Sequence, residues 1–508
     1  MSASRSPSVD GTTAQSAVAF LLLLAVMIFT PLFRAGATPF AAMVSQLLAV
    51  GLLVAVLWAP QRIAISSAQA IGLLLLALLP ALYLIPLPAD FVAGLPGREL
   101  YVQAQDYLAA AATDAAGTLA VYPGAAGAAV LALVLPISVF LAVRVLRPAQ
   151  IDILIALVIA IAALQALLGL LQYGTLQSGG SPLVVEGASG GSAVGTYANR
   201  NHLAGLIEMV LPVALALLFY HLSRLKRDVT GPTTVKRGAA AAGTRSGQAA
   251  LLYSAVALLL VVGVAFTRSR TGIALTILGV LLTTVLFSQQ LGRRTALGPA
   301  GAILALALAG GVAIGLAPVL DRFSVSGLEG DARWQIFDQT LLGAGAFFPF
   351  GSGPGTFPAV FPAFQPLELG RFFINRAHND FLEWFFDLGA LGILLPVFAL
   401  VLYAYQWQRI FTARASGRAF YVQAGCGIGV LLLGLHEFVD YNLATPANQV
   451  AFALLLSTFL YPPERLAQAD KGSSRKQRAA LDLEAITAPV PISSSPPKDQ
   501  IDNPFLCR

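Results

Sequence analysis

Charged side chains are scarce in this sequence. They make up 11% of the 508 residues, and hydrophobic side chains make up 57%, whereas a soluble domain usually carries about a quarter charged residues. This excess of apolar side chains excludes a soluble globule and requires lipid around the folded chain. We expect one membrane domain at 17–461, a short N-terminal segment at 1–16, and a disordered tail at 462–508 that is too polar to bury a core.

Cysteine is almost absent as well. Cys426 lies in an apolar run and Cys507 is the penultimate residue, so the sequence offers no disulfide framework, zinc site or haem attachment. The glycine-rich stretch Gly351–Gly355 lacks the Gly-Lys-Ser/Thr ending of a nucleotide-binding loop and is typical of a tight turn. The basic residues are not interleaved with aromatic ones, as they would be on an RNA-binding surface. We therefore expect no metal, no cofactor and no nucleic-acid partner.

Long apolar runs dominate the rest of the chain. A helix needs about 20 mostly apolar residues to cross the hydrocarbon core of a bilayer. Twelve segments approach this length, near 17–34, 40–58, 69–86, 124–143, 150–173, 201–220, 250–266, 271–288, 297–319, 384–405, 419–438 and 445–461. They predict an all-α, multi-pass membrane protein of about twelve transmembrane helices. Ala35–Ala37 imitates a signal-peptidase site, but the segment before the first run is weakly basic, so we expect a retained helix.

The basic residues fall unevenly on the two sides of these spans. If the spans alternate in direction, one side receives both termini and 22 Lys and Arg residues, and the other receives nine, all arginine. Cytoplasmic loops carry the basic excess, so both termini are predicted to be cytoplasmic. The outer face then holds 87–123, 174–200 and a large loop, 320–383, between the ninth and tenth spans. Arginine suits phosphate binding there because its planar fork donates to two oxygens at once; snorkelling toward lipid headgroups is the alternative.

The large loop ends in a polar cluster where the tenth span begins. His378 and Asn379 are followed by Asp380 and Glu383, whose spacing is that of a helix capping box. A capping role would satisfy the first amide groups of the helix and its dipole. His378 has no such duty, and the near-neutral titration of histidine suits a general base. The alternative interpretation is an ordinary surface histidine.

Three further polar clusters are predicted on the same face, at 196–202, 267–271 and 435–442. Ionisable groups near a membrane interface are costly and often mark a substrate path. Together with the large loop, these clusters supply arginines, a histidine and carboxylates, but no catalytic triad and no metal-ligand spacing. That combination suits transfer to or from a lipid that carries pyrophosphate, with arginines holding the leaving group and a histidine deprotonating the attacking hydroxyl.

The order of these motifs resembles that of the O-antigen ligase and polymerase superfamily of bacterial membrane glycosyltransferases. The likeness runs from about Gly195 to Pro446 and rests on 195–202, 269–270, 351–357 and 377–380, together with Arg333, Glu383, Gly389, His436 and Asp440. The resemblance implies a metal-independent enzyme that uses undecaprenyl-diphosphate-linked glycans at the periplasmic face of the bacterial inner membrane. It also implies that the large loop closes over the site.

The resemblance further implies roles for single residues. His378 matches the loop histidine that activates the acceptor hydroxyl. The pyrophosphate-binding arginines of the family correspond to Arg200, Arg270 and Arg333, and Arg268 is a fourth candidate. The other residues expected to contact substrate are Asn199, Asn379, Asp380, Glu383 and His436.

The sequence leaves the acceptor open. A ligase would transfer the glycan to lipid A core and a polymerase to another repeat unit, and members of the superfamily also glycosylate proteins. A solute transporter would instead need broken helices with ionisable groups at mid-membrane in two matching halves, whereas the polar residues here gather at one interface. We predict an O-antigen ligase-like glycosyltransferase surrounded by membrane lipids, with a polymerase as the alternative.

Overall fold

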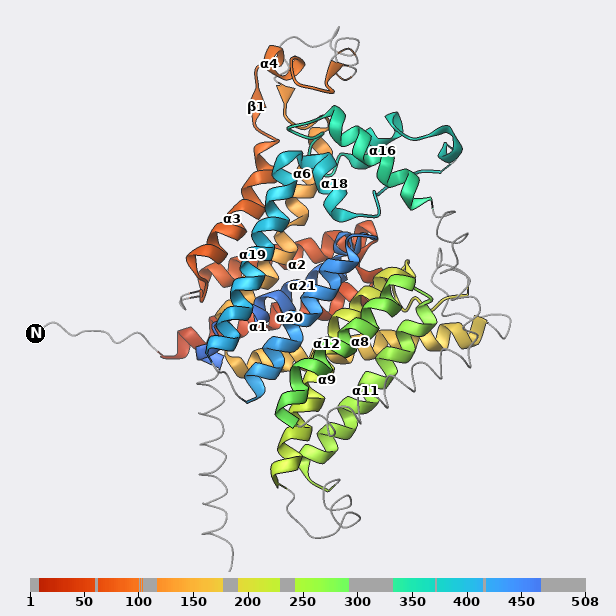
Figure 1. Ribbon diagram of the computed structural model, residues 1–508. Coiled ribbons are helices and arrows are strands. Elements are labelled where there is room, and N and C mark those ends of the chain that lie inside the picture. The colour runs from red at the N-terminus through yellow and green to blue at the C-terminus, as the bar shows by residue number, and fades with distance from the viewer. Residues whose placement is uncertain are drawn as a thin grey trace, which may run out of the picture.

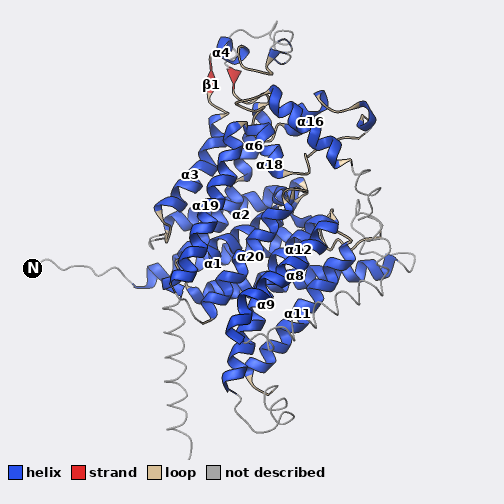
Figure 2. Cartoon of the chain, viewed as in Figure 1, coloured by secondary structure: helices blue, strands red, loops and turns tan. Residues whose placement is uncertain are grey.

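The structure is a computed structural model that describes residues 9–59, 63–99, 101, 103, 117–176, 191–228, 243–291, 332–370, 372–413 and 417–466. These residues form a bundle of helices joined by short elements (Figures 1 and 2). In chain order the first half contains α1 (Val9–Leu32), η1 (Arg34–Gly36), α2 (Pro39–Trp58), α3 (Ser67–Leu82), β1 (Pro86–Leu87), α4 (Ala89–Ala93), β2 (Gly117–Thr118), α6 (Pro123–Ala132), α7 (Val134–Val145) and α8 (Pro148–Leu176). The second half contains α9 (Arg200–Asp228), α11 (Arg245–Thr267), α12 (Arg270–Leu291), α16 (Arg333–Ala346), α17 (Phe357–Val360), η2 (Phe361–Ala363), η3 (Leu367–Leu369), α18 (Asp380–Leu388), α19 (Ala390–Thr412), α20 (Arg418–His436), η4 (Asn442–Ala444) and α21 (Pro446–Phe459).

Eight helical segments in the described part are long and apolar enough to cross a membrane. They are Pro39–Trp58, Pro123–Val145, Pro148–Gly174, Arg200–Leu225, Arg245–Thr267, Arg270–Ser288, Ala390–Thr412 and Arg418–His436. Ser16–Leu32 and Ser67–Leu82 are shorter apolar helices, and α21, over the last predicted span, has 14 residues. The chain is therefore a mostly helical membrane protein. The predicted span near 297–319 and the tail beyond residue 466 lie outside the described residues, so the count of twelve stays a prediction.

The core of the bundle forms around α9 and α20. Both are buried along most of their length, and α9 packs against α8, α11, α12 and α20. Two glycines four residues apart allow the close approach of α20: a Cβ at Gly429 would lie 2.1 Å from the Met209 carbonyl oxygen, and one at Gly425 would lie 2.9 Å from the Ala216 side chain. Small residues at this spacing are a common device for packing helices within membranes.

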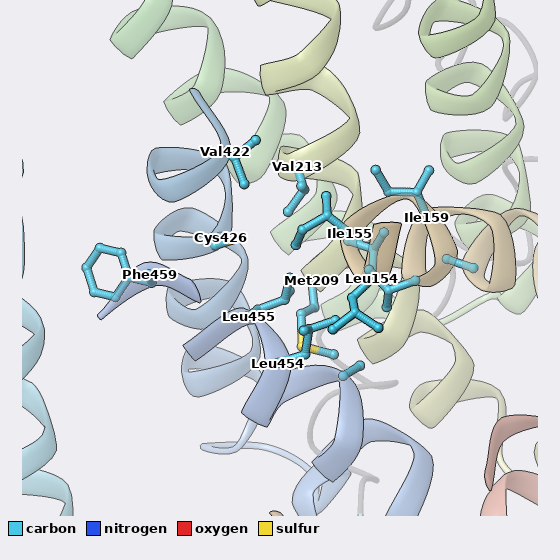
Figure 3. Close-up of a cluster of buried hydrophobic side chains, with 14 of the residues drawn as sticks. Leu154, Ile155, Ile159, Met209, Val213, Val422, Cys426, Leu454, Leu455 and Phe459 are labelled. Atoms are coloured by element: carbon cyan, nitrogen blue, oxygen red, sulfur yellow. The ribbon is translucent and has the colours of Figure 1, made fainter. Parts of the chain in front are cut away.

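Figure 3 shows apolar side chains of this core, which come from four helices. Those labelled are Leu154, Ile155 and Ile159 of α8, Met209 and Val213 of α9, Val422 and Cys426 of α20, and Leu454, Leu455 and Phe459 of α21. Cys426 is fully buried among them, where its thiol acts as a small apolar group.

The bundle has two ends that differ in their polar chemistry. We call the end where α9 and α12 begin and α11 and α20 finish the site end, and the end where α21 finishes the far end. At the far end, Gln69 and Arg144 donate to the Leu460 carbonyl at 2.9 and 3.1 Å. Gln406 and Gln423 each donate to the carbonyl oxygens on either side of it. These bonds satisfy helix-terminal carbonyls that would otherwise be buried without donors.

The described parts of the two long segments that the sequence predicts at the outer face pack together at the site end. β1 and β2 pair antiparallel, and the chain beyond β2 donates from the Val121 N–H to the Ser352 carbonyl at 2.8 Å. The buried Arg98 donates from Nη2 to the Gly351 carbonyl at 2.9 Å. All three glycines of Gly351–Gly355 have positive φ, which confirms the predicted tight turn.

This glycine turn fixes the C-terminal end of α18. The Gly353 N–H donates to the main-chain carbonyl of Asp387 at 2.7 Å, and the Gly355 N–H donates to its carboxylate at 2.6 Å. On another side α18 packs against α16 (Figure 1). The helix is therefore held between the glycine turn and α16, and the segment just before it, which contains His378, has a defined position.

Candidate active site

The N-cap of α18 lies one residue earlier than the capping-box spacing predicts. Asn379, not Asp380, is the cap: its backbone is extended, and its Oδ1 accepts the Leu382 N–H at 3.0 Å. The residue just before the cap, His378, has a φ of 56°, so the chain makes a left-handed turn there and enters the helix at Asn379.

Glu383 does not complete a capping box either. Its Oε1 accepts from Arg376 Nη1 at 2.7 Å, and its Oε2 accepts from the Ala377 N–H at 2.8 Å. The side chain is buried, so the carboxylate fastens the approach to His378 onto the first turn of α18.

Asp440, between α20 and η4, is the point where the separate polar clusters meet. Its Oδ2 accepts from Asn201 Nδ2 at 2.6 Å and from Arg333 Nη2 at 3.3 Å. Its Oδ1 accepts the Tyr441 N–H at 3.0 Å and lies 3.6 Å from Nδ1 of His378. The starts of α9 and α16 and the residue pair before α18 therefore converge on one fully buried carboxylate.

The charge of this carboxylate is stabilised by its neighbours. Burial opposes ionisation, but the contact with His378 and the charge of Arg333 outweigh it and hold the pKa of Asp440 well below its usual range. Arg333 also donates from Nη1 to the Val439 carbonyl at 2.8 Å, so its fork grips two acceptors on the same segment. A fixed negative charge therefore stands beside His378.

Tyr441 holds two histidine rings at once. The rings of His202 and His378 each lie 4.8 Å from its ring in edge-on geometry. His202 is anchored in turn by Thr445, whose Oγ1 lies 2.8 Å from Nδ1 of the histidine. His378, in contrast, keeps 26% of its side chain exposed. Its ring is thus oriented by a carboxylate and an aromatic ring and still open to a ligand.

Arg200 and Arg268 flank the segment 191–195. Arg200 Nη1 donates to the Ser192 hydroxyl at 3.3 Å. Arg268 Nη2 donates to the Tyr173 hydroxyl at 3.2 Å, and its guanidinium lies 5.5 Å from the same ring. Arg200 is the first residue of α9 and immediately precedes Asn201, which donates to Asp440. Arg268 is turned toward α8 instead.

Two of the predicted site residues have an unusual backbone. Arg268 and His378 have φ values of 55° and 56°, a region that residues other than glycine rarely adopt. Strained positions of this kind gather at functional sites. At Arg268 the left-handed turn ends α11, and Arg270 then becomes the first residue of α12.

His436 lies inside the bundle. It is the last residue of α20, is 1% exposed, and has its Nδ1 2.8 Å from Oε1 of Glu208 in α9. Its carbonyl accepts the Asp440 N–H at 3.1 Å. The His436–Glu208 pair therefore joins the end of α20 to α9, and the backbone bond from Asp440 to His436 attaches the Asp440 segment to this pair.

Several residues of this site were given no role from the sequence. Asp440 and Asn201 were noted only within the motifs that carry the resemblance, and Tyr441 only as a member of a polar cluster. Glu208 was not noted at all, although a single carboxylate inside the apolar run 201–220 is unusual enough in a membrane helix to mark it.

The arrangement can carry out acid–base chemistry next to a polyanion. A partly exposed histidine oriented by a buried carboxylate can accept a proton, and Arg333 and the arginines near the start of α9 offer positive charge on the same end of the bundle. Within the described ranges, no group of three or more His, Cys, Asp or Glu side chains is arranged to hold a metal ion.

Comparison with known proteins adds the family. Residues 255–397 match the family model described as O-antigen ligase, which confirms the resemblance to the O-antigen ligase and polymerase superfamily. The match contains Arg268, Arg270, Arg333 and His378, whereas Arg200 and Asp440 lie outside it. No curated protein sequence matches the chain. This match and the apolar helices together indicate a membrane protein of the bacterial envelope.

Proposed function

We propose that this chain, which carries an O-antigen ligase domain, transfers a glycan from undecaprenyl diphosphate to an acceptor hydroxyl at the periplasmic face of the inner membrane. The acceptor oxygen forms a bond to the anomeric carbon, and the bond from that carbon to the phosphate oxygen breaks. The electron pair of the broken bond leaves with the diphosphate. The proton of the hydroxyl passes to His378.

The observation that carries the proposal is the placement of His378. Its Nδ1 faces the Asp440 carboxylate at 3.6 Å and its ring packs against Tyr441. A proton on Nδ1 points toward the carboxylate, which leaves the lone pair of Nε2 to take the acceptor proton. The negative charge of Asp440 then stabilises the imidazolium that forms. A general base must be oriented in this way to act within hydrogen-bond reach of its substrate.

The leaving group is the second half of the proposal. Undecaprenyl diphosphate gains negative charge as the sugar departs, and arginine forks stabilise such charge better than lysine does. Arg333, like His378, lies beside the Asp440 carboxylate, and 25% of the Arg333 side chain is exposed. We assign it, with Arg200 and Arg270, to the diphosphate.

His378→Gln tests the base directly. Glutamine retains hydrogen bonding but cannot take a proton at neutral pH, so transfer of labelled glycan by membranes is expected to fall by about 10²- to 10⁴-fold, with normal amounts of protein. His221→Gln is the matched control, because that histidine is stacked on Tyr253 and has no part in the proposed site. Near-normal transfer by His378→Gln would remove the base from the mechanism.

The acceptor is proposed to be lipid A core, which makes the enzyme a ligase. The glycan profile of a deletion strain tests this part. Bare core with accumulating lipid-linked polymer is the expected result, whereas products carrying a single repeat unit would identify a polymerase.

The orientation is proposed from the distribution of basic residues. Reporter fusions after Gly330 are expected to report the periplasm, and fusions after Arg414 the cytoplasm. A cytoplasmic signal at Gly330 would place the site on the wrong side of the membrane and contradict the proposed donor.

A further inference from the structure

Two buried carboxyl groups lie together where the His378 segment meets the Asp440 segment. Asp380 is the first residue of α18, and Glu437 directly follows α20. The Asp380 N–H donates to the Glu437 carbonyl at 2.9 Å, and the two carboxyl groups are close enough to act directly on each other. Asp380 is 5% exposed and Glu437 is 1% exposed. Two buried carboxyl groups placed side by side repel each other when both are ionised, which favours a proton on one of them.

The surroundings of Glu437 indicate where the proton resides. Its Oε2 accepts the Leu443 N–H at 3.4 Å. Its Oε1 is buried, and no N–H or O–H group of the described residues donates to it. A buried carboxylate oxygen without a donor is costly, whereas a protonated oxygen is itself a donor and needs an acceptor. The Asp380 carboxyl supplies that acceptor.

The charged groups around the pair favour the same assignment. The charges that act on Glu437 come from Asp380 and Asp440, and both disfavour its ionisation. Asp380 faces Glu383 and Asp440 and also the positive charge of Arg376. Burial, followed by Asp380 and Asp440, raises the pKa of Glu437 well above its ordinary range, and burial raises the pKa of Asp380 to about 7.

We propose that Glu437 is a protonated carboxylic acid at neutral pH, that it donates a hydrogen bond to Asp380, and that the pair is a positioning element that fixes His378 against Asp440. His378 lies two residues before Asp380, and Asp440 lies three residues after Glu437, so the pair joins the two halves of the site. The effect on transfer rests on the proposed function, whereas the protonation of Glu437 does not.

The test uses Glu437→Gln in the full-length protein in lipid nanodiscs. Glutamine is neutral and of similar shape, and its amide donates to Asp380, so the thermal unfolding midpoint and the transfer rate at neutral pH are expected to stay close to those of the wild type. Glu437→Ala removes the donor and is expected to lower transfer on the order of tenfold, about the loss of one hydrogen bond to a charged group. Glu383→Gln is the matched control: it breaks the ion pair with Arg376 and is expected to lower the midpoint.

The pH dependence separates a protonated Glu437 from an ionised one. Because the pKa of Glu437 is raised on folding, its contribution to stability is complete below the ordinary pKa of a glutamate and is lost as pH rises through the folded value. Between the ordinary pKa of a glutamate and the raised pKa in the folded protein, the folding equilibrium constant falls by up to about tenfold for each pH unit. Glu437→Gln removes this dependence, so the wild-type midpoint is expected to fall relative to that of the variant as the pH rises above the ordinary pKa of a glutamate.

Either of two results would overturn the proposal. One is a Glu437→Gln variant that is destabilised as much as Glu383→Gln at neutral pH. The other is a midpoint difference between wild type and Glu437→Gln that stays constant with pH. A pH-dependent midpoint difference in a protein that transfers no glycan would support the protonated pair and overturn the proposed function alone.

Discussion

The two ends of the bundle are both rich in polar side chains, but they use them differently. At the far end, Gln69, Arg144, Gln406 and Gln423 all donate to main-chain carbonyls just beyond α21. At the site end, side chains from four segments bind one another around Asp440, and His378 and Arg333 stay about a quarter exposed. A buried side chain bound to backbone serves the fold. A partly exposed side chain held by other side chains can also meet a ligand.

The largest effect expected from this comparison is at Asp440. Asp440→Asn removes the charge that orients His378 and compensates Arg333, so transfer is expected to fall by about 100-fold or more. The protein should still insert, because the amide retains part of the hydrogen bonding to Asn201. The measurement is transfer per molecule in membranes with matched protein levels. Transfer within about twofold of the wild type would show that His378 needs no orienting charge.

The second largest effect on transfer is expected when the guanidinium group of Arg333 is replaced. Arg333 donates through two nitrogens, to Asp440 and to Val439, and lysine can serve only as a point charge. Arg333→Lys is expected to reduce transfer by about 10- to 100-fold, equivalent to about 1.4 to 2.8 kcal/mol, and Arg270→Lys is expected to impair it as well.

Arg409 at the far end provides the control for these variants. It pairs with Glu464 through one nitrogen, and exposed ion pairs contribute little, so Arg409→Lys is expected to transfer normally. Equal activity of all three lysine variants would mean that the arginines act only as general positive charge.

A smaller effect, on stability alone, is expected where α20 crosses α9. A Cβ at Gly429 would lie 2.1 Å from the Met209 carbonyl, whereas one at Gly434 on the same helix would meet nothing within 4 Å. Gly429→Ala should therefore separate the helices and cost about 1–3 kcal/mol, and Gly434→Ala should be neutral or slightly stabilising. Thermal unfolding in detergent would measure both, and equal midpoints would contradict the packing argument.

The smallest effect is expected at the far end. Gln423→Leu removes donors to the Tyr461 and Phe459 carbonyls, but Gln406 still donates to both. The loss is expected to be about 1 kcal/mol of stability, with transfer per folded molecule unchanged. A clear loss of transfer in this variant would show that the far end affects the site end and does not serve stability alone.

The amino-acid sequence by itself determined the membrane class, the positions of most helices and the resemblance to the O-antigen ligase family. Apolar runs such as 201–220 need lipid wherever they lie, and that requirement is set by composition. The glycine turn at Gly351–Gly355 was equally local, because positive φ is a property of the residue type. His378 was proposed because its polar cluster stands out at the edge of an apolar segment, and Arg333 was proposed from the resemblance.

The tertiary structure alone decided which polar groups meet. Asp440 and Asn201 are 239 positions apart in the chain, and nothing local in either segment predicts their contact. The capping box was misassigned because the left-handed turn at His378 depends on packing around α18 and on the Asp440 segment. Glu437 looked like one more carboxylate of a polar cluster, since a protonated acid is defined by burial and by its neighbours. Local periodicity fixes helices, but the partner of a buried polar group is chosen by how those helices pack.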